Sequence, residues 1–433
     1  MATSSLSSGG NTALTPLPAS ERLFGWRDHA ALWLSLGVGL LVMQIGAYLV
    51  PAIGTQVALA VIVCGSVLGA GLLAWTAKIG CDSGLSSAGL MHATYGSSFA
   101  RLPVLLNIVQ LIGWTTFELV VMRDGTVAIE RQSGGFIGTL WPVLTTLLWG
   151  ALLLALLAGS MVKLVRQFIG RYGLPLVIAS LLWLSWQFLS KAHAQGLSDL
   201  WQRAGDGSMS TLSALDLVIA MPVSWLPLVA DFARHGRNGN SALRGTWLGY
   251  AVANIWCYAL GLLVALTTPS TYLVAALLLA QGGLIALGLI LIDEVDNAYG
   301  DLYSGSVAGH SLQPGWSVRR WGMALAVLCT GLALVLPMHS LEPFLLMLSS
   351  VFVPLYGVIL ARLAGQSNLV SLMTERRVNT SAVAIWLLGV ACYHLCAQLA
   401  PNWGAALPTL LLTFVLARLT RNLFKSSAVS AAV

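Results

Sequence analysis

The sequence contains twelve apolar stretches, each long enough to cross the roughly 30 Å hydrocarbon core of a bilayer as a helix. Unpaired backbone N–H and C=O groups are costly in lipid, so such a chain is expected to form a bundle of transmembrane helices. Charged residues are 9% of the chain, against about 25% in a soluble domain. The predicted spans are 28–50, 55–77, 102–122, 136–158, 172–190, 213–230, 244–268, 274–298, 320–338, 342–363, 381–399 and 403–420.

The two ends of the chain differ from the apolar region between them. Residues 1–24 are rich in Ser, Thr, Gly and Pro and hold no apolar run, so we expect a disordered tail and not a signal peptide. A single transmembrane domain is expected over residues 25–421, followed by a short tail over 422–433. No long hydrophilic insertion suggests a separate soluble domain.

The positive residues predict the topology. With a cytoplasmic N-terminus, 18 of the 22 Lys and Arg residues fall on the cytoplasmic side, and only Arg123, Arg131, Lys191 and Arg203 fall on the other. This bias indicates an even number of spans and two cytoplasmic tails. We therefore expect a multi-pass protein of the cell (inner) membrane with the lipid bilayer as its partner. The net charge of +6 follows from this topology, so no nucleic-acid partner is expected.

The first predicted span is rich in glycine. It contains Gly37, Gly39 and Gly46, with Gln44 between the last two. Glycines at this density are typical of close packing between helices. They are equally typical of an unwound stretch whose backbone groups line a binding site, so both interpretations are open.

The sixth predicted span is interrupted by Pro222 and Pro227, with Ser224 and Trp225 between them. Each proline removes a backbone hydrogen bond, and a broken helix is tolerated in a membrane only where protein or a water-filled cavity satisfies it.

Breaks in the first and sixth spans are five spans apart, which predicts a fold of two inverted repeats. Each repeat would have five helices, over about residues 28–190 and 213–363, and two extra helices would follow over 381–420. In transporters of this architecture the site lies near the midplane between the broken helices.

Three residues of the third span form a polar and aromatic stripe. Gln110, Trp114 and Glu118 recur every four residues and so share one helical face. An interior Trp alone is more often packing, but an amide, a flat ring and a carboxylate on one face suit a planar, hydrogen-bonding ligand.

The eighth predicted span ends in an acidic cluster, Asp293-Glu294-Val295-Asp296-Asn297. Charge in hydrocarbon costs several kcal/mol, so such residues usually face a cavity and have a function there. The spacing predicts that Asp293, Asp296 and Asn297 share a face opposite the stripe of the third span. An enzyme is the alternative: a membrane prenyltransferase holds Mg²⁺ with aspartate-rich turns, as Asp293, Asp296 and Asp301 suggest, although only Asp231 offers a second candidate.

Four segments follow the pattern of a known family. They are Ala-Asp-Phe-Ala-Arg-His-Gly-Arg-Asn at 230–238, Gly113-Trp114, Leu287-Gly288-Leu289 with Asp296-Asn297-Ala298, and the tract 80–101 with Tyr95-Gly96. On these residues the chain resembles the nucleobase:cation symporter-1 family of cytosine, purine and hydantoin permeases, which has the leucine-transporter-type fold. Residues 110–114 and 224–231 are most similar to the branch linked to hydroxymethylpyrimidine, a thiamine precursor.

The resemblance implies a symporter that imports a planar nitrogen heterocycle by alternating access, and neither an enzyme nor a cofactor-dependent protein. Substrate-binding residues would be Gly39, Gln44, Gln110, Trp114, Glu118, Ser224 and Trp225, with Trp114 stacking on the heterocycle. Cation-coupling residues would be Gly37, Asp293, Glu294, Asp296 and Asn297. Sodium-coupled members carry two hydroxyl residues where this chain has Asp293 and Glu294, so coupling to H⁺, to Na⁺ or to neither stays open. No resident metal is expected, and the sequence does not determine the oligomeric state.

Overall fold

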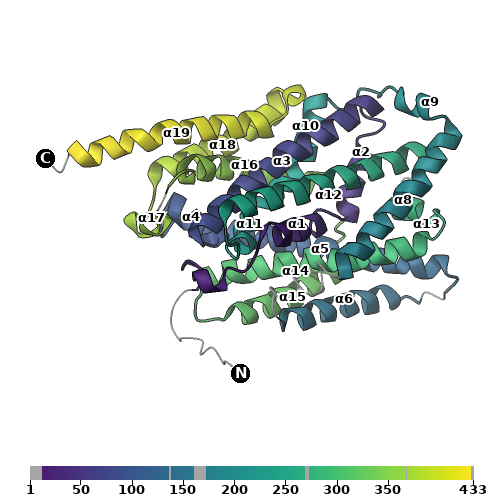
Figure 1. Cartoon of the computed structure of the whole chain (residues 1–433), viewed down its shortest axis with the longest axis horizontal. Coiled ribbons are helices and arrows are strands. Elements are labelled where there is room, and N and C mark those ends of the chain that lie inside the picture. The colour runs from purple at the N-terminus through teal and green to yellow at the C-terminus, as the bar shows by residue number, and fades with distance from the viewer. Residues whose placement is uncertain (1–11, 136–137, 160–171, 269–272, 367, 431–433) are drawn as a thin grey trace.

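The computed structural model describes residues 12–135, 138–159, 172–268, 273–366 and 368–430, with side chains of the last helix described as far as residue 421. Within these residues the chain is helical, without strands, and holds one isolated parallel bridge between Phe24 and Gly236. The long helices run roughly along one direction, horizontal in Figure 1. Their bounds are α1 (Trp26–Ser35), α2 (Leu40–Tyr48), α3 (Thr55–Ser83), α4 (Ser87–Tyr95), α5 (Arg101–Gln132), α6 (Trp141–Leu157), α8 (Leu174–Gln195), α9 (Leu197–Trp201), α10 (Thr211–Ser224), α11 (Leu226–Ala233), α12 (Gly239–Thr267), α13 (Leu273–Leu278), α14 (Gly283–Leu312), α15 (Val318–Val335), α16 (Leu341–Leu363), α17 (Leu369–Glu375), α18 (Thr380–Leu399) and α19 (Ala406–Ser430).

Each predicted span corresponds to one helix or to a pair of helices. In the described part of the chain, eight helices are long and apolar enough to cross a membrane, with α10 and α11 counted as one, and the bent pair α1–α2 makes a ninth. The other predicted spans are α6, which has 17 residues, α14, whose middle is acidic, and α19.

Helix α14 is longer than predicted. The predicted span ended at residue 298, but the helix continues to Leu312 and has 30 residues, which is about 45 Å. The cluster 293–297 therefore lies near the middle of the helix and not at its end. All five of its residues are buried by protein, which is how charged groups are tolerated at this depth.

The first span is broken and the sixth is interrupted, as the glycines and prolines predicted. Helices α1 and α2 meet at an angle of 62°, with residues 36–39 between them. The interruption between α10 and α11 falls on Trp225 and is milder, because the pair is not bent by more than 40°.

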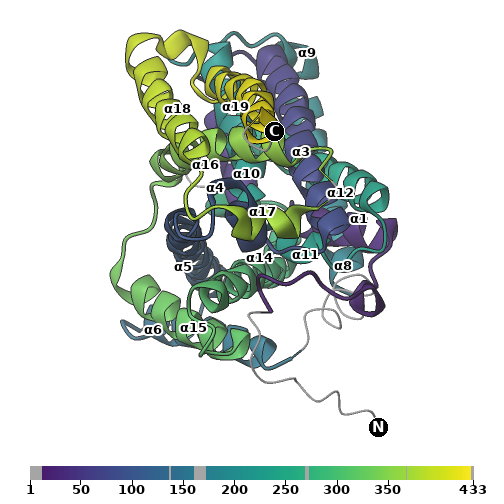
Figure 2. The same cartoon turned by 90° about the vertical axis from the view of Figure 1, so that its left-hand side faces the viewer.

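The broken first span and the interrupted sixth span pack against the long helices of the bundle. α1 and α2 pack against α12, α3 packs against α10 and α12, and α5 packs along α14. α18 and α19 pack on α16, while α6 and α15 cover the opposite side of the bundle (Figure 2). The predicted fold, two inverted repeats of five helices and two extra helices, is confirmed.

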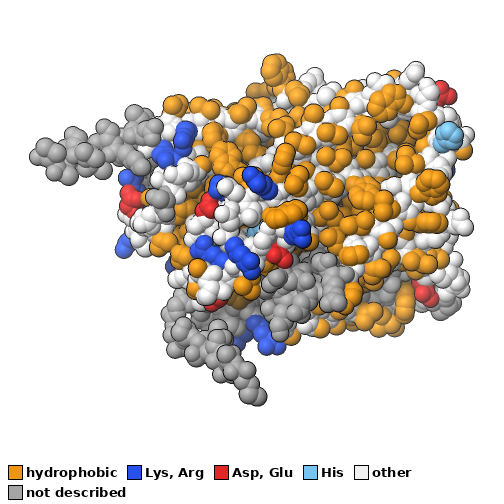
Figure 3. Space-filling model, viewed as in Figure 1, with side chains coloured by type: hydrophobic (Ala, Val, Ile, Leu, Met, Phe, Trp, Pro, Cys, Tyr) orange, Lys and Arg blue, Asp and Glu red, His pale blue; other side chains and the backbone are white. Residues whose placement is uncertain are grey.

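The outer surface of the bundle is suited to lipid. Apolar side chains cover most of the face that Figure 3 shows, whereas Lys and Arg gather at the end where α4 and α17 lie. Leu148, Trp186 and Val335 are 67%, 67% and 73% exposed. An apolar surface of this extent needs a lipid environment.

The N-terminal segment differs from the prediction. The Leu17 amide donates to the Gly84 carbonyl at 2.9 Å, and the Phe24 amide donates to the His235 carbonyl at 2.8 Å. The prediction of a disordered tail is therefore wrong for residues 12–24, which are bound to the bundle. The α19 backbone is helical as far as Ser430. Residues 1–11 and 431–433 of the predicted tails, and 136–137 of the fourth span, lie outside the described residues.

Candidate substrate and cation site

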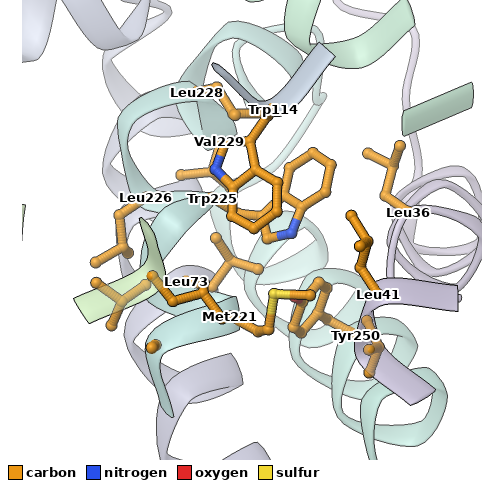
Figure 4. Packing of buried hydrophobic residues seen from close by; sticks show 14 of the residues in the cluster. Leu36, Leu41, Leu73, Trp114, Met221, Trp225, Leu226, Leu228, Val229 and Tyr250 are labelled. Carbon is orange, nitrogen blue, oxygen red and sulfur yellow. The ribbon is translucent and has the colours of Figure 1, made fainter. Parts of the chain in front are cut away.

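A cavity with about 380 Å³ of empty space lies where the broken first span meets α5, α10, α11 and α14. Trp114 and Trp225 line this cavity together with Leu36 and Leu41 of the first span, which lie to one side of the two indole rings in Figure 4. Seven of the residues predicted for the site line this cavity, namely Gly39, Trp114, Glu118, Ser224, Trp225, Glu294 and Asn297.

Both tryptophans are held by other aromatic rings. The centroids of the Trp114 and Phe344 rings are 5.1 Å apart, and the ring planes meet at 75°. The Trp225 ring lies 5.9 Å from the Trp33 ring at 89°. Edge-to-face contacts of this kind fix the plane of an indole ring, so both rings are positioned before a ligand binds.

Four buried polar atoms on the cavity wall have no hydrogen-bond partner among the described residues. They are the Nε1 donor of Trp114 and the acceptors Oε2 of Glu118, Oδ1 of Asn297 and Oδ2 of Asp301. An unpaired buried polar atom costs about 1–3 kcal/mol, so native proteins rarely leave four of them together. Their presence indicates a site for a polar ligand that mainly offers hydrogen-bond donors.

Asp301 is a polar wall residue that was predicted only for the enzyme alternative and not for substrate binding. It follows Glu294 by seven residues and Asn297 by four, so all three lie on one face of α14. This spacing is the signal that could have identified it.

The same face of α14 satisfies the backbone at the break in the first span. The Glu294 Oε1 accepts from the Leu40 amide at 2.5 Å, and the Asn297 Nδ2 donates to the Val38 carbonyl at 3.1 Å. A Cβ atom at Gly39 would lie 3.1 Å from Glu294 Oε1, so the glycine permits this close approach.

Asp293 and Asp296 form a separate group. The Ser35 hydroxyl lies 3.0 Å from Oδ1 of Asp293 and 3.2 Å from Oδ2 of Asp296. Neither aspartate lines the cavity. Of the three residues predicted to share one face, only Asn297 therefore reaches the cavity, whereas the two aspartates contact the end of α1.

Gln110 supports the cavity wall from behind. Its Nε2 donates to the Asn107 side chain at 2.9 Å and to the Ser224 carbonyl at 3.3 Å, while the Asn107 Nδ2 donates to the Pro227 carbonyl at 2.9 Å. The Leu228 amide bonds to the Trp225 carbonyl, which leaves the Ser224 carbonyl for Gln110. Two amides of α5 therefore satisfy the interruption between α10 and α11.

Ser224, Gly37 and Gln44 were also predicted for the site. The Ser224 hydroxyl donates to the Met221 carbonyl at 2.7 Å, so it can only accept from a ligand. A Cβ atom at Gly37 would lie 2.7 Å from the Ala253 Cβ, which makes this glycine a close contact with α12. Gln44 is half-buried, and neither it nor Gly37 lines the cavity.

The enzyme alternative is not favoured by this arrangement. Asp293 and Asp296 contact Ser35, whereas Asp301 faces the cavity, and Asp231 accepts from the Ser87 amide at 3.0 Å and from the Ser304 hydroxyl at 2.5 Å. Among the described residues, no group of three or more His, Cys, Asp or Glu side chains is arranged to hold a metal ion.

A broken first span, an interrupted sixth span and a cavity between them define a membrane transporter of the leucine-transporter type. A family model described as a permease for cytosine/purines, uracil, thiamine and allantoin matches residues 16–417. The chain belongs to this family of permeases, which confirms the predicted relationship at the level of the family.

Solved structures agree with the fold. Mhp1, a nucleobase-cation-symport-1 family transporter, in a closed conformation with bromovinylhydantoin bound, has a TM-score of 0.80 at 16% identity, with 95% of this chain and 94% of Mhp1 covered. Its inward-facing conformation gives 0.74 at 16% identity over 95% and 92% of the two chains. A Na⁺-coupled sialic acid symporter in a substrate-bound outward-open state gives 0.63 at 11% identity over 93% and 90%. A comparison with curated protein sequences finds no match.

Proposed function

We propose that this permease imports a planar nitrogen heterocycle, a nucleobase or a hydroxymethylpyrimidine-like thiamine precursor, by alternating access. The observation that carries the proposal is the set of four unpartnered polar atoms in a cavity that two indole rings line. A flat ring gains contact area from the indoles, and its N–H groups can pair with the oxygens of Glu118, Asn297 and Asp301. Trp114 is the stacking platform, because its ring plane is fixed by Phe344.

The coupling cation, H⁺ or Na⁺, is assigned to the acidic residues of α14. One hydroxyl hydrogen on Ser35 serves only one of the two carboxylates that it approaches. The second contact needs either a proton on one aspartate or a cation between the groups. Glu294 contacts α2, and the two aspartates contact α1. Binding of a proton or Na⁺ to these carboxylates therefore changes the contacts of both halves of the broken span.

The orientation follows from the distribution of positive charge. We infer that both termini are cytoplasmic, because Lys and Arg gather at the end where the described chain begins and α19 ends (Figure 3). The cell membrane is kept as the predicted location. Import then means movement of substrate and cation towards this end of the molecule.

A ligand screen tests the proposal. Thermal unfolding of the purified full chain in detergent is measured with cytosine, purines, hydantoins and hydroxymethylpyrimidine, each with and without Na⁺ and at two pH values. We expect at least one heterocycle to raise the unfolding temperature, because a ligand that binds the folded state stabilises it. If Na⁺ enlarges the rise in unfolding temperature that a ligand causes, the coupling ion is sodium. If this rise changes only with pH, the coupling ion is the proton. Absence of stabilisation by every heterocycle, with the folded protein verified by cooperative unfolding, contradicts the proposal.

A further inference from the structure

A second and larger cavity, with about 900 Å³ of empty space, lies at the end of the molecule where Lys and Arg gather. It is formed by the end of α4, the end of α16, α17 and α19 (Figure 2). Its wall contains Arg362, Arg376 and Arg421 against a single acidic residue, Glu375. It shares no lining residue with the substrate cavity.

The frame of this basic pocket is fixed by backbone and amide hydrogen bonds. The Arg376 carbonyl accepts from the Ser97 amide at 3.0 Å. The Asn379 amide donates to the Tyr95 carbonyl at 2.9 Å, and its Nδ2 donates to the Thr94 carbonyl at 3.0 Å. These bonds tie the α17–α18 connection to the end of α4, so Arg376 projects from a positioned backbone. Positioned groups lose less entropy when they bind a ligand.

Arg362 lies in the wall of the basic pocket, and not all of its N–H donors are bonded. Its Nη2 donates to the hydroxyls of Ser381 at 2.8 Å and Thr420 at 3.4 Å. Its Nε is buried and has no partner among the described residues. Both partners are neutral, and no carboxylate among the described residues forms an ion pair with this guanidinium.

Arg421 contributes charge, although its Nη1 is already bonded. Its Nη1 donates to the Ala364 carbonyl at 2.9 Å and so caps the end of α16. Glu375 offsets little of the positive charge in the pocket. Its Oε1 lies 3.9 Å from the Arg376 Nε, and the side chains of Glu375 and Arg376 are 55% and 47% exposed. An exposed ion pair at this separation contributes little free energy. Three guanidiniums therefore share the pocket without an equal number of anions.

We propose that the basic pocket binds a phosphate group, with Arg362 and Arg376 as its principal ligands. A guanidinium matches phosphate oxygens with two parallel N–H groups, and arginine is the residue that proteins prefer for this purpose. The phosphate comes either from a free anion or from the headgroup of an anionic lipid, since basic pockets between helices at this side of a membrane bind such headgroups.

Binding of two probes to the purified full chain tests the proposal. Inorganic phosphate is titrated in detergent by calorimetry, and lipid selectivity is measured by native mass spectrometry after reconstitution with phosphatidylglycerol and phosphatidylcholine. We expect Arg376→Gln to weaken binding about 10- to 100-fold, because it removes charged hydrogen bonds. Glu375→Gln is expected to strengthen it about 2- to 5-fold, because it removes a competing negative charge. Arg319→Gln, an exposed site at the start of α15 and outside the pocket, is expected to leave it unchanged.

The outcomes separate the two sources. Phosphate binding without preference for phosphatidylglycerol assigns a soluble anion, and preference for phosphatidylglycerol assigns a lipid headgroup. Failure of both probes to bind, or equal losses in Arg376→Gln and Arg319→Gln, overturns the proposal. The opposite signs expected for the neighbouring Arg376→Gln and Glu375→Gln variants exclude loss of folding as the explanation, because an unfolded pocket cannot bind more tightly.

Discussion

The Glu294 carboxylate of α14 accepts a hydrogen bond of 2.5 Å from the backbone amide of Leu40, the first residue of α2. A side chain of the eighth span thus caps the second half of the broken first span. A negative group at a helix N-terminus satisfies an otherwise unpaired N–H and interacts favourably with the helix dipole. The geometry of the break therefore depends on Glu294.

Glu294→Ala is expected to lower the free energy of unfolding by about 1–3 kcal/mol, because it leaves the buried Leu40 amide without an acceptor. Glu294→Gln keeps an acceptor oxygen and is expected to cost less. The measurement is thermal unfolding in detergent, with Glu342→Gln in the first turn of α16 as the control. Equal stability of the Ala and Gln variants would show that the hydrogen bond does not hold the break.

Asp293→Asn and Asp296→Asn are each expected to change the pH or Na⁺ dependence of uptake into proteoliposomes. Both carboxylates approach the single hydroxyl of Ser35, so a neutral amide removes the group that needs a proton or a cation. Ser35→Ala is expected to shift the same dependence in a smaller degree. Asp199→Asn, exposed in α9, is the control. Ion dependence identical to that of the unaltered protein in both aspartate variants would exclude them from coupling.

The helices of this fold were predictable because length and apolar composition decide whether a segment enters a bilayer. The breaks were predictable because Gly39, Pro222 and Pro227 interrupt helices by their own chemistry. Which face of α14 meets the cavity was not predictable from spacing. Every residue from 293 to 297 is buried, so a neighbour covers each face, and only the packed bundle shows that Ser35 lies against one and Leu40 against the other.

The interruption in the sixth span illustrates the same limit. Gln110 was predicted to contact substrate because it shares a face with Trp114. Its partners are Asn107 and the Ser224 carbonyl, which are three and 114 residues away in the sequence. The contact with the Ser224 carbonyl depends on how α5 packs, and local periodicity does not contain this information. Asn107 was missed for the same reason.

Asn107→Leu and Gln110→Leu are each expected to lower the free energy of unfolding by about 1–3 kcal/mol, because the carbonyls of Pro227 and Ser224 lose their side-chain donors. Uptake is expected to fall further than stability alone explains, since the released segment includes Trp225 on the cavity wall. Gln202→Leu, whose single bond to Ser198 is 3.4 Å long and exposed, is the control. Stability equal to that of this control would contradict the role of the two amides.

Trp114→Ala is expected to abolish detectable uptake while the protein still unfolds cooperatively, because the heterocycle loses its platform. Stacking of a flat base on an aromatic side chain contributes about 1–3 kcal/mol, so affinity in the thermal-shift titration should fall about 5- to 150-fold. Trp114→Phe keeps part of the aromatic face and is expected to retain partial uptake. Trp186→Ala, 67% exposed on the lipid-facing side, is the matched control. Uptake by Trp114→Ala at the level of this control would show that the substrate site lies elsewhere.

Two buried histidines outside the spans make stability depend on pH. Burial lowers the pKa of His92 to about 4, aided by the positive charge of Arg101. Burial lowers the pKa of His235 to about 3, aided by Arg234 and then His29. Both folded pKa values lie below the unfolded value of about 6.5, so the unfolded state binds protons first as the pH falls.

The stability that the neutral histidines contribute is therefore complete above pH 6.5 and is lost progressively as the pH falls towards 4. Between pH 7.5 and pH 5 we expect a loss of about 1–2 kcal/mol for each residue. Thermal unfolding at the two pH values measures it. His92→Gln and His235→Gln should each flatten the dependence, whereas His193→Gln, which alters an exposed residue near the end of α8, should not. An unchanged pH dependence in the double variant His92→Gln/His235→Gln would show that these imidazoles are not the groups that take up protons on unfolding.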